Sequence, residues 1–193
     1  MIRRLADSAY TVEKLKQTIL TCLNEKDFAD ITITELSRLA GISRTSFYLF
    51  FESKEALFVA LCESIIGKWF QPFFDLNISN EEGRERELFY ELIRWLQEWA
   101  PALRRAVSVR TEASDGFLLF AAELENNMRR QKVLQAKETN RQKRYDLFIK
   151  IYSVGLIALF EWWLNEGEGF EAEEFHAMIE RLRYKGYFSI LDD

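Results

Sequence analysis

The chain has 193 residues, of which 48% are hydrophobic and 30% charged, with only two prolines and eight glycines. This composition supports a packed core and excludes an intrinsically disordered chain, and a formal net charge of −5 excludes a protein that coats nucleic acid through bulk positive charge. The scarcity of helix breakers and of strict apolar alternation favours an all-α fold, in one large or two small domains.

The first predicted helix runs from about Thr11 to Lys26, where apolar residues recur at helical spacing. After a short acidic link, the segment Thr-Ile-Thr-Glu at 32–35 matches a capping box. In such a box the hydroxyl of Thr32 accepts from the backbone N–H of Glu35, and the carboxylate of Glu35 accepts in return from the backbone N–H of Thr32. A second helix is therefore expected to begin here.

The second predicted helix, about residues 33–40, is followed by a tight turn. Its inward-facing residues are expected to be Leu36, Leu39 and Ala40. Gly41 can adopt the left-handed conformation that ends a helix, because it has no Cβ. Ser43 has the position of the next N-cap. Two short helices joined in this way predict a helix-turn-helix.

The third predicted helix begins at Arg44 and carries two kinds of residue on opposite sides. Phe47 and Phe51 face the core, with Phe50 or Leu49 nearby, whereas Arg44, Thr45 and Tyr48 face outward. An arginine can donate two parallel hydrogen bonds to guanine, a threonine methyl can touch a thymine methyl, and a tyrosine hydroxyl can bind phosphate. The pattern suits a recognition helix, although it also fits a helical hairpin with a merely polar surface.

Residues 32–58, TITELSRLAGISRTSFYLFFESKEALF, resemble the DNA-binding segment of tetracycline-repressor-type (TetR family) transcription regulators. The shared features are the Thr-led helix, Ala-Gly-Ile-Ser at the turn, Phe-Tyr in the third helix and Phe-x-Ser-Lys-Glu-x-Leu after it. The resemblance is strong over about residues 10–66, and beyond them it is limited to the expected arrangement of helices. It implies a three-helix DNA-binding domain at 1–52 and a helical domain at 53–193 that binds an effector and dimerises.

The resemblance also implies roles for individual residues. Tyr48 and Lys54 would each contact a phosphate, and Thr32 and Thr34 would lie near the phosphate backbone. Arg44, Thr45 and Ser46 would face base edges or adjacent phosphates. The expected DNA-binding residues are Thr32, Thr34, Arg44, Thr45, Ser46, Tyr48 and Lys54. Family members commonly carry Tyr or His where this chain has Phe50, so Phe50 can offer only an apolar contact, such as one to a thymine methyl.

The rest of the chain predicts further helices, of which the first ends at Pro72 and is followed by a polar loop at 77–83. The predicted helices lie at about 53–70, 84–100, 102–112, from 114 onward, 147–164 and 171–185. Residues 129–144 hold seven basic residues and one Glu, which indicates either an anion site or, as we favour, a solvated helix face.

The segment 147–164 is apolar almost all round, so it must be buried on every side. It is barely long enough to span a membrane, and we interpret it as a core helix instead. The resemblance implies that the last two helices pair with those of a second copy, giving a homodimer whose two-fold axis matches a palindromic operator in double-stranded DNA. The expected interface residues are Leu156, Leu159, Phe160, Phe175, Ile179 and Leu182.

The resemblance further implies a small-molecule pocket in the second domain. Its expected wall residues are Trp95, Trp99, Phe117, Phe120, Phe148, Tyr152 and Trp163. These aromatics either line a largely apolar cavity or simply fill the core. No cofactor or metal is expected, because His176 is the only histidine and the chain has no Cys/His cluster.

Taken together, the sequence predicts a homodimeric repressor that an apolar ligand releases from its operator. The alternative is a regulator of the same fold that responds to a protein partner or has no effector. An enzyme is not supported, since no phosphate loop or nucleophile motif is present. The N-terminus lacks the apolar core of a secretory signal, and Cys22 and Cys62 lie on apolar stripes, so a cytoplasmic location is expected.

Overall fold

The computed structural model describes residues 2–79, 84–130, 139–167 and 169–185, and these residues form helices and connecting turns with no named strand among them. The predicted all-α fold is therefore confirmed. In chain order the helical elements are α1 (Ile2–Glu25), a 3-10 turn η1 (Phe28–Asp30), α2 (Ile33–Ala40), α3 (Arg44–Tyr48), α4 (Lys54–Ser79), α5 (Arg84–Glu98), α6 (Ala100–Val107), α7 (Gly116–Arg130), α8 (Thr139–Glu166) and α9 (Ala172–Lys185).

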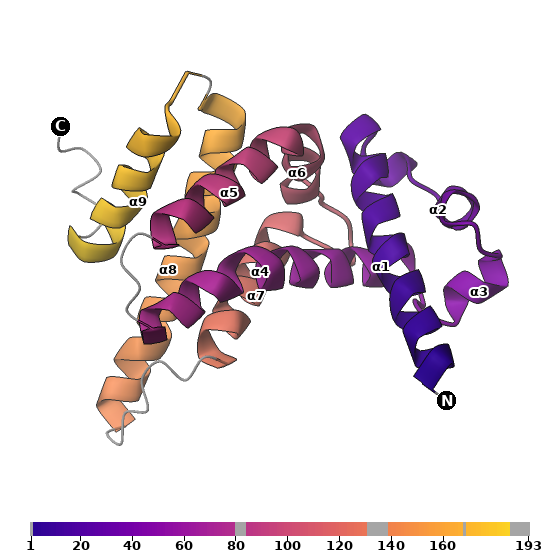
Figure 1. The fold of residues 1–193 in the computed structure, drawn as a ribbon, viewed down its shortest axis with the longest axis horizontal. Helices are drawn as coiled ribbons and strands as arrows, with labels where there is room; N and C mark the ends of the chain where they lie inside the picture. Colours follow the sequence, from indigo (N-terminus) through magenta and orange to yellow (C-terminus); the bar gives the residue numbers. More distant parts are fainter. Residues whose placement is uncertain (1, 80–83, 131–138, 168, 186–193) are drawn as a thin grey trace.

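The molecule is elongated, with α1–α3 at one end and α8 and α9 at the other (Figure 1). We call α1–α3, with η1, the head and α4–α9 the body. Helix α4 starts beside the head and crosses into the middle of the body, while α6 packs against α1 from the body side. The head is thus joined to the body by the packing of α1 against both α4 and α6.

The core of the head is built from residues that the helical period of α1 turns to one side. Leu15, Ile19 and Leu23 have no exposed surface, and they meet Leu36 of α2 and Phe47 of α3, which also have none. Burying each such side chain stabilises the fold by about 1.5–3 kcal/mol. This small cluster holds two very short helices in place.

Helix α4 differs from its prediction, because it continues through Pro72 to Ser79. A proline has no N–H, so the carbonyl of Lys68 loses its usual partner. The helix continues nonetheless, and the prediction that Pro72 ends it is wrong. The predicted loop at 77–83 is therefore still helical up to Ser79, and residues 80–83 lie outside the described part of the chain.

Helix α6 ends at Val107, earlier than predicted, and a tight connection leads to α7. In this connection the N–H of Thr111 donates to the carbonyl of Ser114 at 2.8 Å, and the N–H of Gly116 donates to the carbonyl of Val109 at 2.8 Å. A Cβ on Gly116 would lie 1.9 Å from the carbonyl oxygen of Ala106. Glycine is therefore required for α6 and α7 to approach this closely.

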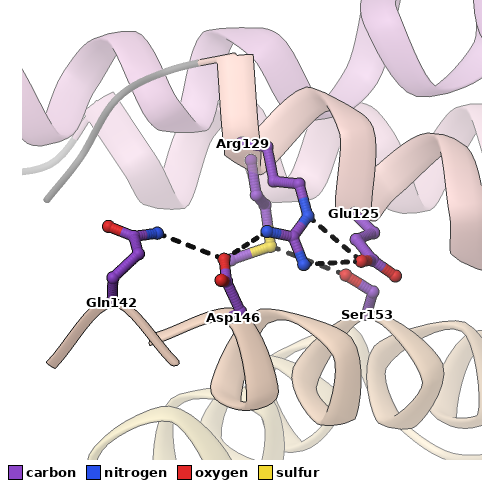
Figure 2. Close-up of polar contacts among 6 residues, drawn as sticks. Glu125, Arg129, Gln142, Asp146 and Ser153 are labelled. Carbon is purple, nitrogen blue, oxygen red and sulfur yellow. Dashed lines mark hydrogen bonds and ion pairs between the residues drawn. The ribbon is translucent and has the colours of Figure 1, made fainter. Parts of the chain in front are cut away.

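The first arginine of the basic run at 129–144, Arg129, forms ion pairs within the protein. Figure 2 shows Arg129 of α7 between Glu125 of its own helix and Asp146 of α8. The Arg129–Glu125 pair spans 2.8 Å, and Gln142 donates to Asp146 at 3.2 Å. These contacts tie α7 to α8, so Arg129 has a structural role that was not predicted, whereas Lys143 and Arg144 are exposed, as expected for a solvated helix face. Residues 131–138 lie outside the described part of the chain.

Helix α8 divides its apolar residues between two sides. Buried members include Ile149, Leu156 and Phe160. A second set, which we call the α8 stripe, is 40–59% exposed and consists of Leu147, Phe148, Ile151, Val154 and Trp162. Within the described residues, Gln142–Glu166 is the one segment long and apolar enough to cross a membrane, a test that core helices of soluble proteins also pass.

Candidate functional site

The helix-turn-helix of the head is closed by the predicted caps. The hydroxyl of Thr32 accepts from the N–H of Glu35 at 3.2 Å, and the hydroxyl of Ser43 accepts from the N–H of Ser46 at 2.9 Å. Gly41 is left-handed, with φ 70° and ψ 33°. The carboxylate of Glu35 accepts from Lys26 at 2.7 Å in place of its predicted reach back to the cap. The ion pair ties the end of α1 to the start of α2.

The recognition helix α3 has the predicted two sides. Phe47 is completely buried, whereas Arg44 and Thr45 are exposed and Tyr48 is 49% exposed. The ring of Tyr48 packs edge-on against Phe47, with centroids 5.7 Å apart. The buried phenylalanine therefore fixes the orientation of a helix whose polar side chains face outward.

The remaining expected DNA contacts lie on the same part of the head. Thr32 and Thr34, at the start of α2, are exposed. Ser46 is half-buried, and its hydroxyl lies 2.8 Å from that of Ser43. Thr32 and Ser46 therefore already take part in capping contacts, while Thr34 is an exposed hydroxyl.

Lys54 has a structural task in addition to its expected phosphate contact. Its ammonium donates to the carbonyls of Phe28 at 2.6 Å and Ile31 at 2.7 Å, and it lies 4.3 Å from the centre of the Phe28 ring. Burial lowers the pKa of Lys54 from its ordinary value. Lys54 thus holds the η1 link against the start of α4, and its contact with phosphate stays a prediction.

Local charge at the helix-turn-helix differs from that of the whole chain. Between Thr32 and Phe51 the sequence has two arginines, Arg38 and Arg44, and both are exposed. The one acidic residue of this segment is Glu35, whose carboxylate forms an ion pair with Lys26. With two arginines and one glutamate, this segment has a net charge of +1 in a chain whose net charge is −5, and its exposed arginines are available to a polyanion.

Two apolar residues of the head lie elsewhere than expected. Leu39 is 45% exposed, so the prediction that it faces inward is wrong. Leu49, which directly follows α3, is 79% exposed. Phe50, expected to offer the apolar contact to DNA, is half-buried and packs against the core. The position of Leu49 one helical turn after Thr45 was the signal that could have identified it as outward-facing.

The body contains an apolar cavity between α4, α5, α6, α7 and α8, with a volume of about 50 Å³. Of the expected wall residues, Trp95 and Phe120 line it. Trp69 and Phe70 of α4 were not among the expected wall residues, but they also line the cavity and pack on Trp95 and Phe160 respectively. A cavity of this volume holds a few water molecules at most. It is much smaller than a usual ligand pocket, which measures about 300–1,000 Å³.

The other expected wall residues have different surroundings. Phe148 is half exposed on α8 and stacks on Tyr152, with centroids 5.6 Å apart. Trp163 is buried and stacks on Phe175 at 5.4 Å. Trp99 and Phe117 are half-buried and pack against the core. These five aromatics are not among the residues that line this cavity.

Helix α6 lies between the cavity and the head. Leu103 and Val107 line the cavity, whereas Arg105, on the other side of the helix, reaches α1. Its guanidinium donates to the carbonyls of Leu23 and Asn24, each at 3.0 Å, and pairs with Asp27 at 3.1 Å. Arg105 therefore donates to carbonyls at the end of α1, where the helix itself provides no N–H donors.

Three of the six expected interface residues are core residues of one protomer. Leu156 is 5% exposed, Phe160 8% and Phe175 0% in the isolated chain. Leu159 and Ile179 are half-buried, and the side chain of Leu182 lies outside the described part of the structure. Because a residue buried inside one protomer has no surface left for another, the α8 stripe is the apolar surface of this helix that remains uncovered.

The histidine and the two cysteines have apolar surroundings in the described part of the chain. Among the described residues, no group of three or more His, Cys, Asp or Glu side chains could hold a metal ion. His176 is half-buried against the Phe89 ring, with centroids 4.7 Å apart. Burial raises the pKa of Cys22 and of Cys62, so both thiols stay protonated and unreactive.

Comparison with known proteins places the match in the head. Residues 17–61 match the model of the bacterial regulatory proteins of the tetR family. The chain is 44% identical over 55 residues to the uncharacterized HTH-type transcriptional regulator YerO of Bacillus subtilis, covering 28% of this chain and 19% of that protein. It is 46% identical over 44 residues to the HTH-type transcriptional regulator EthR of Mycolicibacterium smegmatis, covering 23% and 20%. The chain thus spans about a fifth of the length of these relatives.

Two solved structures share the fold over nearly the whole chain. FadR of Thermus thermophilus, a TetR family repressor solved with lauroyl-CoA, has a TM-score of 0.54 at 18% identity and covers 91% of this chain and 94% of its own. NalD of Pseudomonas aeruginosa, the secondary repressor of the MexAB-OprM multidrug efflux pump, has a TM-score of 0.51 at 18% identity, with 93% and 96% covered. At this identity the likeness concerns the fold alone.

Proposed function

We propose that this chain is a cytoplasmic, homodimeric repressor that binds a palindromic operator through its head, a proposal supported by the match of residues 17–61 to the model of the tetR family of bacterial regulatory proteins. The observation that carries the proposal is the recognition helix, which buries Phe47 and turns Arg44, Thr45 and Tyr48 to solvent. Regulation of transcription, rather than catalysis, is the activity of the matched family.

Each exposed group has chemistry suited to double-stranded DNA. Arg44 can donate two hydrogen bonds to O6 and N7 of guanine, which distinguishes this base from the others in the major groove. The hydroxyls of Thr34 and Tyr48 can donate to phosphate oxygens, which position the protein without reading sequence. We therefore assign base reading to Arg44 and Thr45, and backbone contacts to Thr32, Thr34, Ser46, Tyr48 and Lys54.

A homodimer is supported by the α8 stripe. Leu147, Ile151 and Val154 recur at helical spacing along one side of α8, and Phe148 and Trp162 extend that side. A helix that exposes this much apolar surface in one protomer gains free energy by pairing with a partner. The most self-complementary partner is the same helix of a second copy, related by a two-fold axis. Two heads then face two operator half-sites.

The proposed effector is a small, largely apolar molecule that occupies the body cavity. The cavity walls are aliphatic and aromatic, with Glu161 as their one ionisable residue. At about 50 Å³ the cavity must enlarge to hold a ligand, and the aromatic pairs of Trp69 with Trp95 and Phe70 with Phe160 are the side chains in its wall that would move. FadR shows that this fold can hold an acyl ligand.

Helix α6 provides a path from the cavity to the head. A ligand that pushes on Leu103 or Val107 displaces the helix that carries Arg105, and with it the end of α1. Helix α4 offers a second path, since Trp69 lines the cavity and Lys54 holds the η1 link. A ligand that binds better when the heads are misplaced lowers DNA affinity by its differential binding energy, typically about 1–3 kcal/mol.

The alternative function is a regulator of the same fold that answers to a protein partner or to no effector, and the small cavity favours it. Trp69 and Trp95 allow the two to be distinguished, because both tryptophans line the cavity. Apolar compounds of graded size are titrated while tryptophan fluorescence and operator affinity are followed. Saturable quenching with loss of DNA binding supports a ligand, and no change with any compound supports the alternative.

Fluorescence anisotropy at about 0.15 M salt tests the base-reading head directly. The probe is a duplex that the protein selects from a random library, together with its single-base variants. Arg44→Ala should lower discrimination at one base pair by about 5- to 150-fold, the effect of losing a bidentate contact worth about 1–3 kcal/mol. Arg94→Ala removes an exposed arginine from α5 and should change nothing. An equal loss on all sequences for Arg44→Ala would contradict its base-reading role.

A further inference from the structure

Leu49 is the most exposed of the large hydrophobic side chains in the described residues, at 79%. It follows the last residue of α3 with helical backbone angles, φ −74° and ψ −21°, so it continues the turn of the recognition helix. Single exposed leucines are common and need no explanation by themselves. Leu49 differs from other exposed leucines because it lies beside the proposed base-reading residues Arg44 and Thr45.

The outward side of the recognition helix holds two pairs of residues spaced four apart. Arg44 and Tyr48 form a polar pair, whose donors suit bases and phosphates. Thr45 and Leu49 form a second pair, which offers methyl groups. Phe50, which the sequence suggested for an apolar contact, is half-buried against the core. The exposed apolar side chain at this edge of the helix is therefore Leu49.

We propose that Leu49 is a specificity-determining residue that recognises a thymine by packing on its C5-methyl group in the major groove. The inference rests on the proposed function, since it needs α3 to lie in that groove. Thymine is the one standard base that presents a methyl group there. A leucine side chain neither donates nor accepts hydrogen bonds, so it gains free energy only by removing apolar surface from water. Cytosine at the same position would leave its amino group facing an aliphatic side chain, which costs a hydrogen bond.

Deoxyuridine separates this contact from all others, because it differs from thymidine only by the missing methyl group. Each thymine of a selected operator half-site is replaced in turn by deoxyuridine, and affinity is measured by anisotropy with the full-length protein. We expect one position at which the wild type loses about fourfold in affinity per half-site, the effect of removing one buried methyl group. With Leu49→Ala this loss should disappear, while Leu49→Met should retain it.

Two further variants exclude other origins of the effect. Leu118 is 59% exposed on α7, far along the chain from the helix-turn-helix, and Leu118→Ala should keep the full deoxyuridine effect. Thr45→Ser removes a methyl group from the neighbouring residue while keeping its hydroxyl. If Thr45→Ser abolishes the effect and Leu49→Ala leaves it intact, Thr45 reads the methyl group and the proposal for Leu49 is overturned.

The remaining outcomes also decide the matter. A selected half-site without an invariant thymine, or a deoxyuridine effect unchanged in Leu49→Ala, overturns the proposal while the repressor function stands. Failure of the wild type to select any sequence contradicts the proposed function itself, and the reading of thymine with it. Far-ultraviolet circular dichroism of each variant confirms that the exposed substitutions leave the fold intact.

Discussion

The head and the body of this protein are both helical, but different forces fix them. In the head, helices as short as α3, with five residues, are set by caps such as Ser43 and by one buried ring, Phe47. In the body, α8 runs for 28 residues and carries apolar side chains on several sides. The conformation of the head is thus determined by interactions between residues close in sequence. The packing of the body depends instead on which of several apolar helix sides contact one another.

The largest effect is expected from the buried ring at the centre of the head. Phe47→Ala should lower the free energy of unfolding by about 3–5 kcal/mol, because it removes a fully buried ring and leaves a cavity. Urea denaturation followed by circular dichroism measures this. Tyr10→Ala, at a ring that is 69% exposed on α1, is the matched control and should change stability by less than about 0.5 kcal/mol. Equal effects of the two substitutions would show that the head has no such centre.

The α8 stripe should give the next largest effect, on association rather than on folding. Ile151 is 47% exposed, and two copies contribute to a symmetric dimer, so Ile151→Ser should weaken dimerisation by about 2 kcal/mol, or about 30-fold. Analytical ultracentrifugation over a concentration series measures the dissociation constant. Leu118→Ser removes an apolar residue from α7 that is 59% exposed, and it should leave the dissociation constant unchanged. A wild-type chain that stays monomeric, or a dimer that ignores Ile151→Ser, would place the interface elsewhere.

The smallest effect is expected at a cap. Ser43→Ala removes the oxygen that accepts from the N–H of Ser46 and should cost about 1 kcal/mol. Ser43→Asp restores an acceptor and should recover most of the loss. Thermal denaturation of the three proteins measures the difference. If Ser43→Ala were as stable as the wild type, packing rather than capping would hold α3.

These differences explain how much of the molecule the sequence could predict. The caps at Thr32 and Ser43 and the left-handed Gly41 were predictable because each depends on residues within one turn. Leu39 was placed on the wrong side because α2 has only eight residues, too few for periodicity to separate its edge from its core. The exposure of Leu49 went unnoticed beside the more evident aromatic pattern of its neighbours.

In the body, sequence patterns predicted that helices exist but not how they pack. Pro72 removes one backbone hydrogen bond, a local penalty that the long helix α4 tolerates. The helical period could not decide which side of α8 faces inward, because apolar residues occur on all of them. Phe175 and Phe160 consequently proved to be protomer core, while Phe148 and Ile151 remained exposed. Only the packing of α7 and α9 on α8 makes that choice.

Selection of duplexes from a random-sequence library by the purified full-length protein tests the central claim most directly. The claim is that two identical heads, held by paired bodies, bind DNA sequence-specifically. The account predicts enrichment of one inverted repeat, whose half-sites are centred one helical turn apart, about 34–36 Å, or a multiple of this distance. Enrichment of a single unrepeated half-site, or none at all from a protein that sediments as a folded dimer, would contradict it.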